Sequence, residues 1–302
     1  LKESFCILAL LQTLLKQESS ISCSPKPSAQ RYRKCSCGSV PGEDRILGGN
    51  ETNIDQYPWM ALVEYKNSRG SISLGCGATL ISKRYVITAG HCVFGAVIRL
   101  GEYDQSTLKD CVKVPGGQDC NEEPVTIGIE EIIPHPDYQP SRGTEMNDIA
   151  VIRLANDVSY TAFVSPICLP NFDITTQSGV LSTISGWGTT ETAKSSNVKL
   201  HLQIPLVPLA ECQAAYMNPK TPRLQARLWG KQLCAGGQAG KDSCRGDSGG
   251  PLIVINGSKV PLQWTLQGVV SFGPTPCALP NTPGVYTKVY AYLNWIKAQI
   301  RE

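Results

Sequence analysis

The chain has 302 residues, 41% of them hydrophobic, and a formal net charge of +3. This composition suffices for one sizeable domain with a large core, and so small a net charge gives no indication of an acidic partner such as nucleic acid. No stretch approaches the roughly 20 apolar residues that a membrane span needs, and thirteen cysteines indicate an oxidising compartment. We therefore expect a secreted, extracellular protein without nucleic-acid or membrane partners.

The first element with chemical content is a predicted buried strand that ends at His91. In the run from Val86 to Cys92 the apolar residues stop at Ala-Gly, so we expect the histidine at the rim of a sheet. Only two other histidines are present. His135 lies between prolines in an exposed turn, and His201 lies on the polar face of an alternating strand. Both are expected to be structural, which leaves His91 as the candidate base.

A polar loop follows the next strand. Its oxygen-bearing side chains fall within nine residues: Glu102, Asp104, Thr107 and Asp110. Clustered oxygen atoms suit a hard cation such as Ca²⁺, although a metal-free surface loop is the commoner meaning of such a cluster. We take these four residues as the expected ligands of a structural Ca²⁺ ion.

Strand patterns dominate the rest of the chain, where short β-branched and aromatic runs alternate with Gly, Pro and Asn turns. Clear examples are residues 126–133, 149–154, 252–255 and 268–272. Asp148 opens the second of these strands, a place where an aspartate is ordinarily a cap or turn residue. Apolar residues at helical spacing predict a short helix at 209–217 and a C-terminal helix at 290–300.

The segment Gly246-Asp247-Ser248-Gly249-Gly250-Pro251 places one serine between glycines. A serine hydroxyl becomes a useful nucleophile when a base takes its proton and backbone amides reach the reacting oxygen. Flanking glycines let the backbone approach a substrate closely. A Gly-rich turn is the plain alternative. A candidate base, His91, and a candidate acid, Asp148, favour the nucleophile.

These residues resemble the chymotrypsin-like serine protease family over roughly residues 46 to 302. Three motifs occur in the order of the family: Thr88-Ala89-Gly90-His91-Cys92, then Asn147-Asp148-Ile149-Ala150, then the hexapeptide around Ser248. Three spaced motifs in one order are far more specific than any one of them. The resemblance implies an all-β fold of two six-stranded antiparallel barrels with a C-terminal helix and the site between the barrels.

The resemblance also implies roles for the motif residues. His91 would be the general base and then the general acid, while Asp148 would orient it and stabilise its cation. Ser248 would attack the substrate carbonyl. The backbone amides of Gly246 and Ser248 would form the oxyanion hole.

Specificity is implied by four further positions. Asp242 would lie at the floor of the specificity pocket, where a carboxylate pairs with Arg or Lys of a substrate. Gly273 and Gly284 would be the small wall residues that admit a long side chain. Ser271 and Gly273 would pair with the substrate main chain as an added strand.

A basic residue before Ile-x-Gly-Gly, here Arg45 before Ile46, marks the activation bond of zymogens in this family. Cutting it would free an ammonium at Ile46, which would be buried against Asp247 because a buried ion pair is tolerated where a single buried charge is not. The resemblance thus implies a light chain or propeptide at residues 1–45 and a catalytic domain at residues 46–302. We expect the uncut chain to have little activity.

Cysteine spacing alone does not fix connectivity, but the resemblance implies five disulfides. They pair Cys76 with Cys92, Cys111 with Cys120, Cys212 with Cys234, Cys244 with Cys277, and Cys168 with Cys37 or Cys35. The last bond would keep the light chain attached after cleavage. The pair that closes the loop after residue 110 is absent from digestive trypsins and resembles the easter-like, clip-domain proteases of arthropods.

The stretch from Cys6 to Leu15 resembles the middle of a clip domain, which would make residues 1–45 a truncated clip segment. A poor signal-peptide core is the alternative, and the pairing of Cys6, Cys23 and Cys35 is left open. Asn50 and Asn256 each begin a glycosylation sequon, which suits a secreted protein.

Taken as a whole, the sequence predicts a secreted trypsin-like zymogen that cuts after Arg or Lys in an extracellular cascade serving immunity, melanisation or venom. Its partners would be protein substrates, an upstream activating protease and serpin-type inhibitors, and its chemistry would need no cofactor. The alternative is a catalytically inactive homologue that acts as a binding cofactor. Such homologues usually lack the serine, whereas Ser248 is present.

Overall fold

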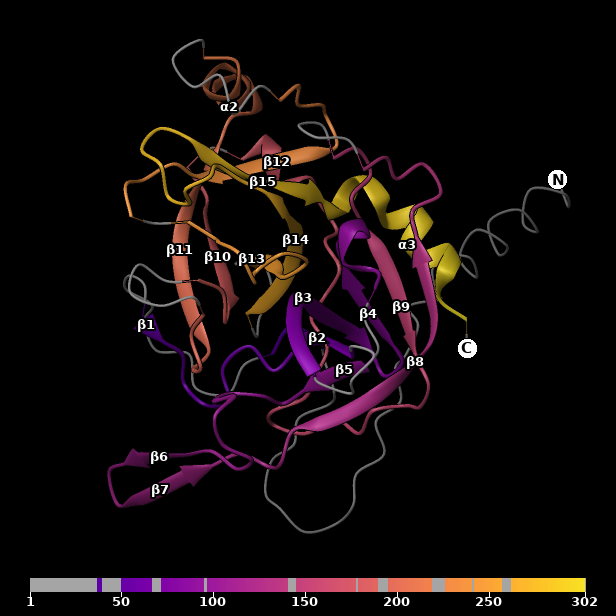
Figure 1. The fold of residues 1–302 in the computed structure, drawn as a ribbon, viewed down its shortest axis with the longest axis vertical. Helices are drawn as coiled ribbons and strands as arrows, with labels where there is room; N and C mark the ends of the chain where they lie inside the picture. Colours follow the sequence, from indigo (N-terminus) through magenta and orange to yellow (C-terminus); the bar gives the residue numbers. More distant parts are fainter. Residues whose placement is uncertain are drawn as a thin grey trace, which may run out of the picture. The chain divides into compact units, whose positions relative to one another are not determined.

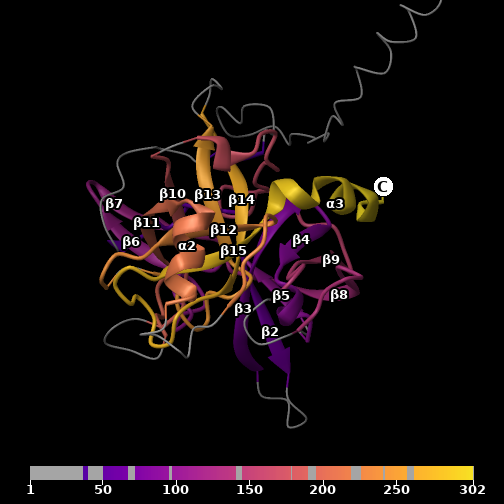
Figure 2. The same cartoon turned by 90° about the horizontal axis from the view of Figure 1, so that it is seen from above.

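A computed structural model describes residues 37–39, 50–66, 72–94, 97–140, 145–177, 179–189, 195–218, 226–240, 242–256 and 262–301. Two closed antiparallel barrels dominate these residues and lie side by side (Figures 1 and 2). The predicted all-β fold with two six-stranded barrels is confirmed. Among the described residues, none of the helices has the length and apolar character needed to cross a membrane.

The first barrel is closed by six strands. In spatial order they are β2 (Met60–Lys66), β3 (Ile72–Ser82), β4 (Tyr85–Thr88), β9 (Ala150–Leu154), β8 (Val125–Pro134) and β5 (Val97–Leu100). The strands β4 and β9 read as nearly continuous apolar runs because both of their faces are buried. Thr88 of β4 pairs with Ala150 of β9, so the end of β4 lies next to the start of β9. His91 lies shortly after the end of β4, and Asp148 lies shortly before the start of β9.

The second barrel contains β10 (Leu181–Gly186), β13 (Pro251–Asn256), β14 (Gln263–Phe272), β15 (Pro283–Lys288), β12 (Gln232–Gly236) and β11 (Leu200–Val207). Pairing of β11 with β12 closes it, and the two-residue strand β1 (Asn50–Glu51) adds to the β11 edge. Its core includes Ile184, Ile204, Leu252 and Tyr286. The strand β14 begins five residues before the predicted 268–272, because Gln263 to Leu266 also pair with β13 and the register then shifts at Gln267.

Helices are few and short. The α2 helix (Leu209–Tyr216) occupies the predicted 209–217. The predicted C-terminal helix is a 3-10 turn, η4 (Val289–Tyr292), followed by α3 (Leu293–Gln299). Ile296 of α3 is fully buried in the core cluster that includes the first barrel. The chain therefore completes its second barrel and then returns to the first. Two further 3-10 turns are η1 (Gly90–Cys92) and η2 (Ile174–Thr176).

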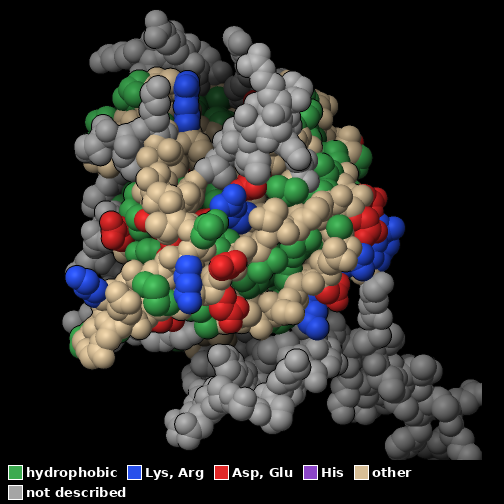
Figure 3. All heavy atoms as spheres, turned by 60° about the horizontal axis from the view of Figure 1, so that its bottom comes forward, with side chains coloured by type: hydrophobic (Ala, Val, Ile, Leu, Met, Phe, Trp, Pro, Cys, Tyr) green, Lys and Arg blue, Asp and Glu red, His purple; other side chains and the backbone are tan. Residues whose placement is uncertain are grey.

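A hairpin of β6 (Cys111–Val114) and β7 (Gly117–Cys120) projects from the barrels at the lower left of Figure 1. Its side chains are mostly exposed, and the Cys111–Cys120 disulfide joins its two ends. One face of the molecule shows acidic and basic side chains interspersed with apolar ones (Figure 3). That mixture agrees with the small net charge of +3.

Five disulfides form among the described residues: Cys37–Cys168, Cys76–Cys92, Cys111–Cys120, Cys212–Cys234 and Cys244–Cys277. Of the two partners that the resemblance allowed for Cys168, the bonded one is Cys37. Backbone hydrogen bonds reinforce this link, since the Gly38 N–H donates to the Pro166 carbonyl and the Trp264 N–H donates to the Gly38 carbonyl. Cys6, Cys23 and Cys35 lie outside the described residues.

Candidate active site

Asp148 and His91 form a buried pair at the rim of the first barrel. The Asp148 carboxylate is fully buried, and one oxygen lies 2.9 Å from His91 Nδ1. The other oxygen accepts the His91 backbone N–H, also at 2.9 Å. Because Nδ1–H donates to the carboxylate, Nε2 carries the lone pair that a general base needs.

The second barrel also holds Asp148. The Ser271 hydroxyl donates to the carboxylate at 2.5 Å, and the Thr287 hydroxyl donates to the Asp148 backbone carbonyl at 2.7 Å. The register of β14 on β15 shifts between Val270 and Phe272, which leaves Ser271 without a partner residue on β15. Such a bulge re-aims a side chain. The sequence resemblance implied for Ser271 only a contact with the substrate main chain, and no local pattern indicates its bond to Asp148.

The charge state of His91 depends on three neighbours. Burial of the ring lowers its pKa, but the hydrogen bond and charge of Asp148, together with the charge of Glu145, outweigh burial and raise the pKa of His91 above its ordinary value. Glu145 lies close enough that His91 in turn stabilises its charge, and it accepts a long hydrogen bond from the Tyr138 hydroxyl at 3.4 Å. The neutral imidazole therefore predominates only above this raised pKa.

Ser248 is half-buried and is held by the first barrel. Its backbone carbonyl accepts the Gly77 N–H of β3 at 2.7 Å, and the Gly77 carbonyl accepts the Thr88 hydroxyl at 2.8 Å. Gly249 has a φ of +77°, and a Cβ there would collide with Thr88 Oγ1. The glycine after the serine is thus required both by its backbone conformation and by the close approach of the two barrels.

The candidate nucleophile Ser248 and the candidate base His91 are not hydrogen-bonded to each other. Among the described residues, no hydrogen bond joins Ser248 to His91, and neither the Gly246 N–H nor the Ser248 N–H donates to a protein acceptor. Gly246 has a φ of +100°, a conformation that favours glycine. Two unengaged amides beside a serine are the kind of donor that an oxyanion requires, and the contact between a base and its nucleophile often tightens only when substrate binds.

Asp242 lies in a cavity of about 770 Å³, together with Cys244 and Asp247. Its Oδ1 accepts the Ser243 N–H at 2.8 Å, whereas its buried Oδ2 has no hydrogen-bond partner among the described residues. A Cβ on Gly284 would lie 2.8 Å from Asp242 Oδ1, and one on Gly273 would lie 4.0 Å from Oδ2. Burial raises the pKa of Asp242 to about 7, which is the response of a carboxyl that lacks a cation.

This raised pKa predicts a pH-dependent cost in stability. Between about pH 4 and about pH 7 the unfolded chain loses the Asp242 proton while the folded chain retains it, so the free energy of unfolding falls as pH rises. Asp242→Asn cannot ionise. We expect the variant to melt a few degrees above the wild type at about pH 8 and at the same temperature near pH 4.

Thermal unfolding followed by circular dichroism at both pH values tests this. The exposed Asp157 supplies the control, since Asp157→Asn should leave the melting temperature unchanged at either pH. A lower melting temperature for Asp242→Asn at about pH 8 would contradict the unpaired carboxylate.

The Asp247 carboxylate lies against Gly186 and Gly188, at the end of β10 and shortly after it. Its carboxylate accepts the backbone N–H groups of Gly188 and Cys244, each at 2.9 Å, and burial raises its pKa to about 6. The same cavity that contains Asp242 reaches Asp247 and continues along Leu200 and His201. Space for a further positively charged group therefore adjoins Asp247. Arg45 and Ile46 lie outside the described residues.

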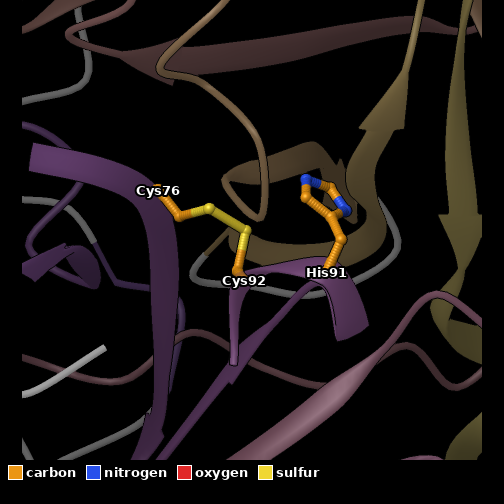
Figure 4. Close-up of side chains that lie close together, drawn as sticks. All are labelled: Cys76, His91 and Cys92. Atoms are coloured by element: carbon orange, nitrogen blue, oxygen red, sulfur yellow. A yellow bond between two sulfur atoms is a disulfide. The ribbon is translucent and has the colours of Figure 1, made fainter. Parts of the chain in front are cut away.

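The Cys76–Cys92 disulfide lies beside His91 (Figure 4). The two sulfur atoms and a ring nitrogen of His91 fall within 4.8 Å of one another. Cysteine binds a metal as the thiolate, and these two sulfurs are bonded to each other, so the disulfide is a structural link to the turn that carries His91.

Hydrogen bonds within the protein engage the carboxylates of two expected Ca²⁺ ligands, Glu102 and Asp110. Glu102 accepts the Tyr103 N–H at 2.9 Å and the Arg99 guanidinium at 3.0 Å. The carboxylate of Asp110 accepts hydrogen bonds from Thr107, Asn121 and the Asp104 N–H. A Ca²⁺ ion with six to eight oxygen ligands would have to displace these internal donors, and the calcium site stays a prediction.

Two histidines and one sequon differ in burial from the sequence-based expectation. His201 is not on a polar face but buried, with Nδ1 2.8 Å from the Tyr57 hydroxyl. His135 is half-buried and packs against the rings of Tyr292 and Trp295. Asn256 is only 7% exposed. Glycosylation at Asn50 and Asn256 stays a prediction.

The comparisons with known proteins agree with this geometry. Residues 46–296 match the family described as Trypsin. Serine protease ea of Drosophila melanogaster is 47% identical over 87% of this chain and 69% of its own length, and Melanization protease 1 of the same species is 45% identical over 88% and 68%. Phenoloxidase-activating enzyme of Bombyx mori is 45% identical over 88% of this chain and 63% of its own length.

A solved structure gives the same result. The crystal structure of the Drosophila Grass clip serine protease of the Toll pathway superposes with a TM-score of 0.75 at 33% identity, covering 95% of this chain and 77% of that one. These matches confirm the resemblance found in the sequence. The chain belongs to the trypsin family of serine proteases, and its relatives include clip-domain serine proteases of insects.

Proposed function

We propose that this protein is a secreted zymogen that, once cut between Arg45 and Ile46, hydrolyses peptide bonds after Arg or Lys. The observation that carries the proposal is the buried, unpartnered Oδ2 of Asp242 in a cavity close to the Asp247–Ser248 segment. An arginine guanidinium would supply the missing donors in bidentate geometry, and a lysine ammonium would supply them as a point charge.

The first half of the reaction forms an acyl-enzyme. His91 Nε2 takes the proton of the Ser248 hydroxyl as its oxygen bonds to the substrate carbonyl carbon. The carbonyl oxygen becomes an oxyanion that accepts the N–H groups of Gly246 and Ser248, a contribution of about 3 kcal/mol for each donor. The imidazolium then protonates the leaving amine as the C–N bond breaks, and Asp148 stabilises that cation through the 2.9 Å hydrogen bond to Nδ1.

The second half reverses these roles with water. His91 removes a proton from a water molecule, which attacks the acyl carbon, and the same proton returns to Ser248 as the ester bond breaks. The products are a carboxylate that ends in Arg or Lys and a restored serine. No cofactor takes part in either half.

Activation would act through Asp247. A new ammonium at Ile46 would pair with a carboxylate that now accepts the amide N–H groups of Gly188 and Cys244. Burial of that pair favours the conformer in which the Gly246 amide and the Asp242 pocket are ordered. We infer that residues 1–45 then stay attached as a light chain through Cys37–Cys168.

The setting we propose is an extracellular arthropod cascade in immunity or melanisation. Five disulfides favour an oxidising compartment, and the names of two relatives refer to melanisation and phenoloxidase activation. Protein substrates, an upstream protease and serpin-type inhibitors follow from that role by analogy with the family.

A substrate panel tests the proposed function. The zymogen is cut at Arg45 and then assayed on anilide substrates that carry Arg, Lys, Phe or Ala before the scissile bond. We expect kcat/KM for Arg and Lys substrates to exceed that for Phe and Ala substrates by at least about 10³-fold, because Phe and Ala leave the Asp242 carboxylate unpaired. The uncut protein should show little turnover.

Each contrary result removes a distinct part of the proposal. No turnover of any substrate by the cut protein would exclude a protease, and preference for Phe would exclude Asp242 as the specificity residue. Full activity of the uncut protein would exclude the role of Asp247 in activation.

A further inference from the structure

The residue before Asp148 has a backbone conformation that few residues adopt. Asn147 has a φ of +56°, in the left-handed region that asparagine tolerates better than most side chains, and it is buried. The Ile149 N–H donates to the Asn147 carbonyl at 2.8 Å, so the backbone makes a three-residue turn with Asp148 at its centre. The direction in which the Asp148 carboxylate leaves the backbone therefore depends on this turn.

The Asn147 side chain holds the turn from two sides. Its Nδ2 donates to the Asp137 backbone carbonyl at 2.9 Å, and its Oδ1 accepts the Tyr292 hydroxyl at 3.0 Å. A carbonyl can only accept, so Nδ2 must face Asp137 and Oδ1 must face Tyr292. The first contact lies within the connection from β8 to β9. The second comes from the C-terminal segment, 145 residues further along the chain.

Tyr292, the last residue of η4, is itself firmly held. Its ring is buried and packs edge-on against His135, with 5.3 Å between the ring centroids. The Lys231 ammonium lies 5.1 Å from the centroid of the Tyr292 ring. Burial raises the pKa of Tyr292, so the hydroxyl keeps its proton at neutral pH and donates to Asn147.

We propose that Tyr292 is a positioning residue for the pair of Asp148 and His91: through Asn147 it fixes the turn at Asp148 and so the contact between the carboxylate and the imidazole. This role rests on the proposed function, in which His91 is the general base. Without the Tyr292 hydroxyl the turn is held from one side only. The carboxylate then gains freedom to rotate, and the hydrogen bond that orients His91 weakens.

The three anchors of Asp148 outside the first barrel have different targets. Ser271 donates to its carboxylate, Thr287 donates to its carbonyl, and Tyr292 donates to the residue before it. Only the Tyr292 contact fixes the backbone conformation from which the Asp148 side chain departs. Loss of this contact should therefore change the orientation of the carboxylate while its burial is retained.

Tyr292→Phe removes the hydroxyl and keeps the ring. In the cleaved protein we expect kcat for an Arg anilide to fall about tenfold, as the loss of one hydrogen bond allows, with KM unchanged. The acid limb of the rate should move to lower pH by at least about 0.3 pH unit. Asp148 and Glu145 both raise the pKa of His91, and a looser Asp148 contributes less while Glu145 is unchanged.

Tyr85→Phe is the matched control. Tyr85 is also buried, and its hydroxyl accepts the backbone N–H of Arg301 at 2.9 Å. Both variants should melt a few degrees below the wild type. Tyr85→Phe should keep wild-type kcat and the wild-type acid limb, since the effect expected for Tyr292→Phe is one of orientation and not of stability.

Asn147→Gly shows whether the effect passes through Asn147. Glycine keeps the left-handed backbone but removes both side-chain hydrogen bonds, so this variant alone should show the same fall in kcat and the same shift of the acid limb. Adding Tyr292→Phe to Asn147→Gly should lower kcat by less than about a further twofold, because the hydrogen bond between the two side chains is already absent.

NMR titration of the histidine rings in the uncut protein reads the same effect without turnover. The chain has only three histidines, and the signal missing from His91→Gln identifies His91. Tyr292→Phe should lower its midpoint by at least about 0.3 pH unit. If the cut wild type has no turnover while this midpoint moves, the proposed function fails and the positioning of His91 stands.

Three results would each overturn the positioning role. They are an unchanged His91 midpoint in Tyr292→Phe, an equal loss of kcat in Tyr85→Phe, and losses that add fully in the double variant of Asn147 and Tyr292.

Discussion

Replacing Ser248 with alanine will lower kcat of the cleaved protein by about a millionfold, because the proposed mechanism passes through an ester at that hydroxyl and no other group can replace it. The backbone should be unaffected. The Ser248 carbonyl, which accepts the Gly77 N–H at 2.7 Å, belongs to the main chain and is retained in alanine. Initial rates with an Arg anilide, measured for the cleaved variant and the cleaved wild type, give the ratio of their kcat values.

Two measurements separate loss of chemistry from loss of folding. Binding of a small arylamidine to Asp242 should be retained in Ser248→Ala, since the 770 Å³ cavity is formed by other residues. Ser159→Ala, a change at an exposed serine on the first barrel, should retain full activity. Turnover by Ser248→Ala within a hundredfold of the wild type would refute the assignment of the nucleophile.

Asp148→Asn should lower kcat by about ten-thousandfold. The two carboxylate oxygens of Asp148 accept three hydrogen bonds, from the His91 N–H, the His91 ring and the Ser271 hydroxyl. An amide offers one oxygen and one NH₂ group, so it cannot accept all three. If the NH₂ group faces Nδ1, the ring proton moves to Nε2 and the lone pair no longer faces Ser248.

The rate of Asp148→Asn as a function of pH checks this explanation. A misplaced tautomer lowers the activity at neutral pH while the affinity for an arylamidine stays unchanged. The exposed Asp137 gives the control, and Asp137→Asn should keep wild-type rates. Ser271→Ala should lose far less than Asp148→Asn, because it removes one donor and leaves the carboxylate in place. Wild-type kcat in Asp148→Asn would mean that His91 does not depend on its partner.

The sequence predicts the architecture well because the relevant signals are local. The apolar runs that form β4 and β9 and the helical spacing at residues 209–217 are each contained in one short segment. The three motifs gave the relative order of His91, Asp148 and Ser248. Their mutual placement, by contrast, required the two barrels to be closed and packed.

What the sequence did not predict depends on partners far along the chain. Ser271 contacts Asp148 across 123 residues, and that contact depends on a bulge that leaves no local sign in the β14 pattern. His201 looked polar because it alternates with leucines, yet Tyr57, 144 residues earlier, supplies a buried partner. The acidic loop suggested a metal because its composition does not show that Arg99 and Asn121 donate hydrogen bonds to Glu102 and Asp110.

The contacts that hold the proposed triad of His91, Asp148 and Ser248 are exchanged between the barrels. Strands β14 and β15 of the second barrel hold Asp148, which belongs to the first, while β3 of the first barrel holds the backbone of Ser248, which belongs to the second. Neither barrel therefore contains a complete site of its own. The distances between the reacting atoms depend on how the two barrels pack against each other. Since a displacement of about 1 Å at reacting atoms can cost a hundredfold in rate, substitutions along the whole inter-barrel surface become catalytic substitutions, however far they lie from the serine.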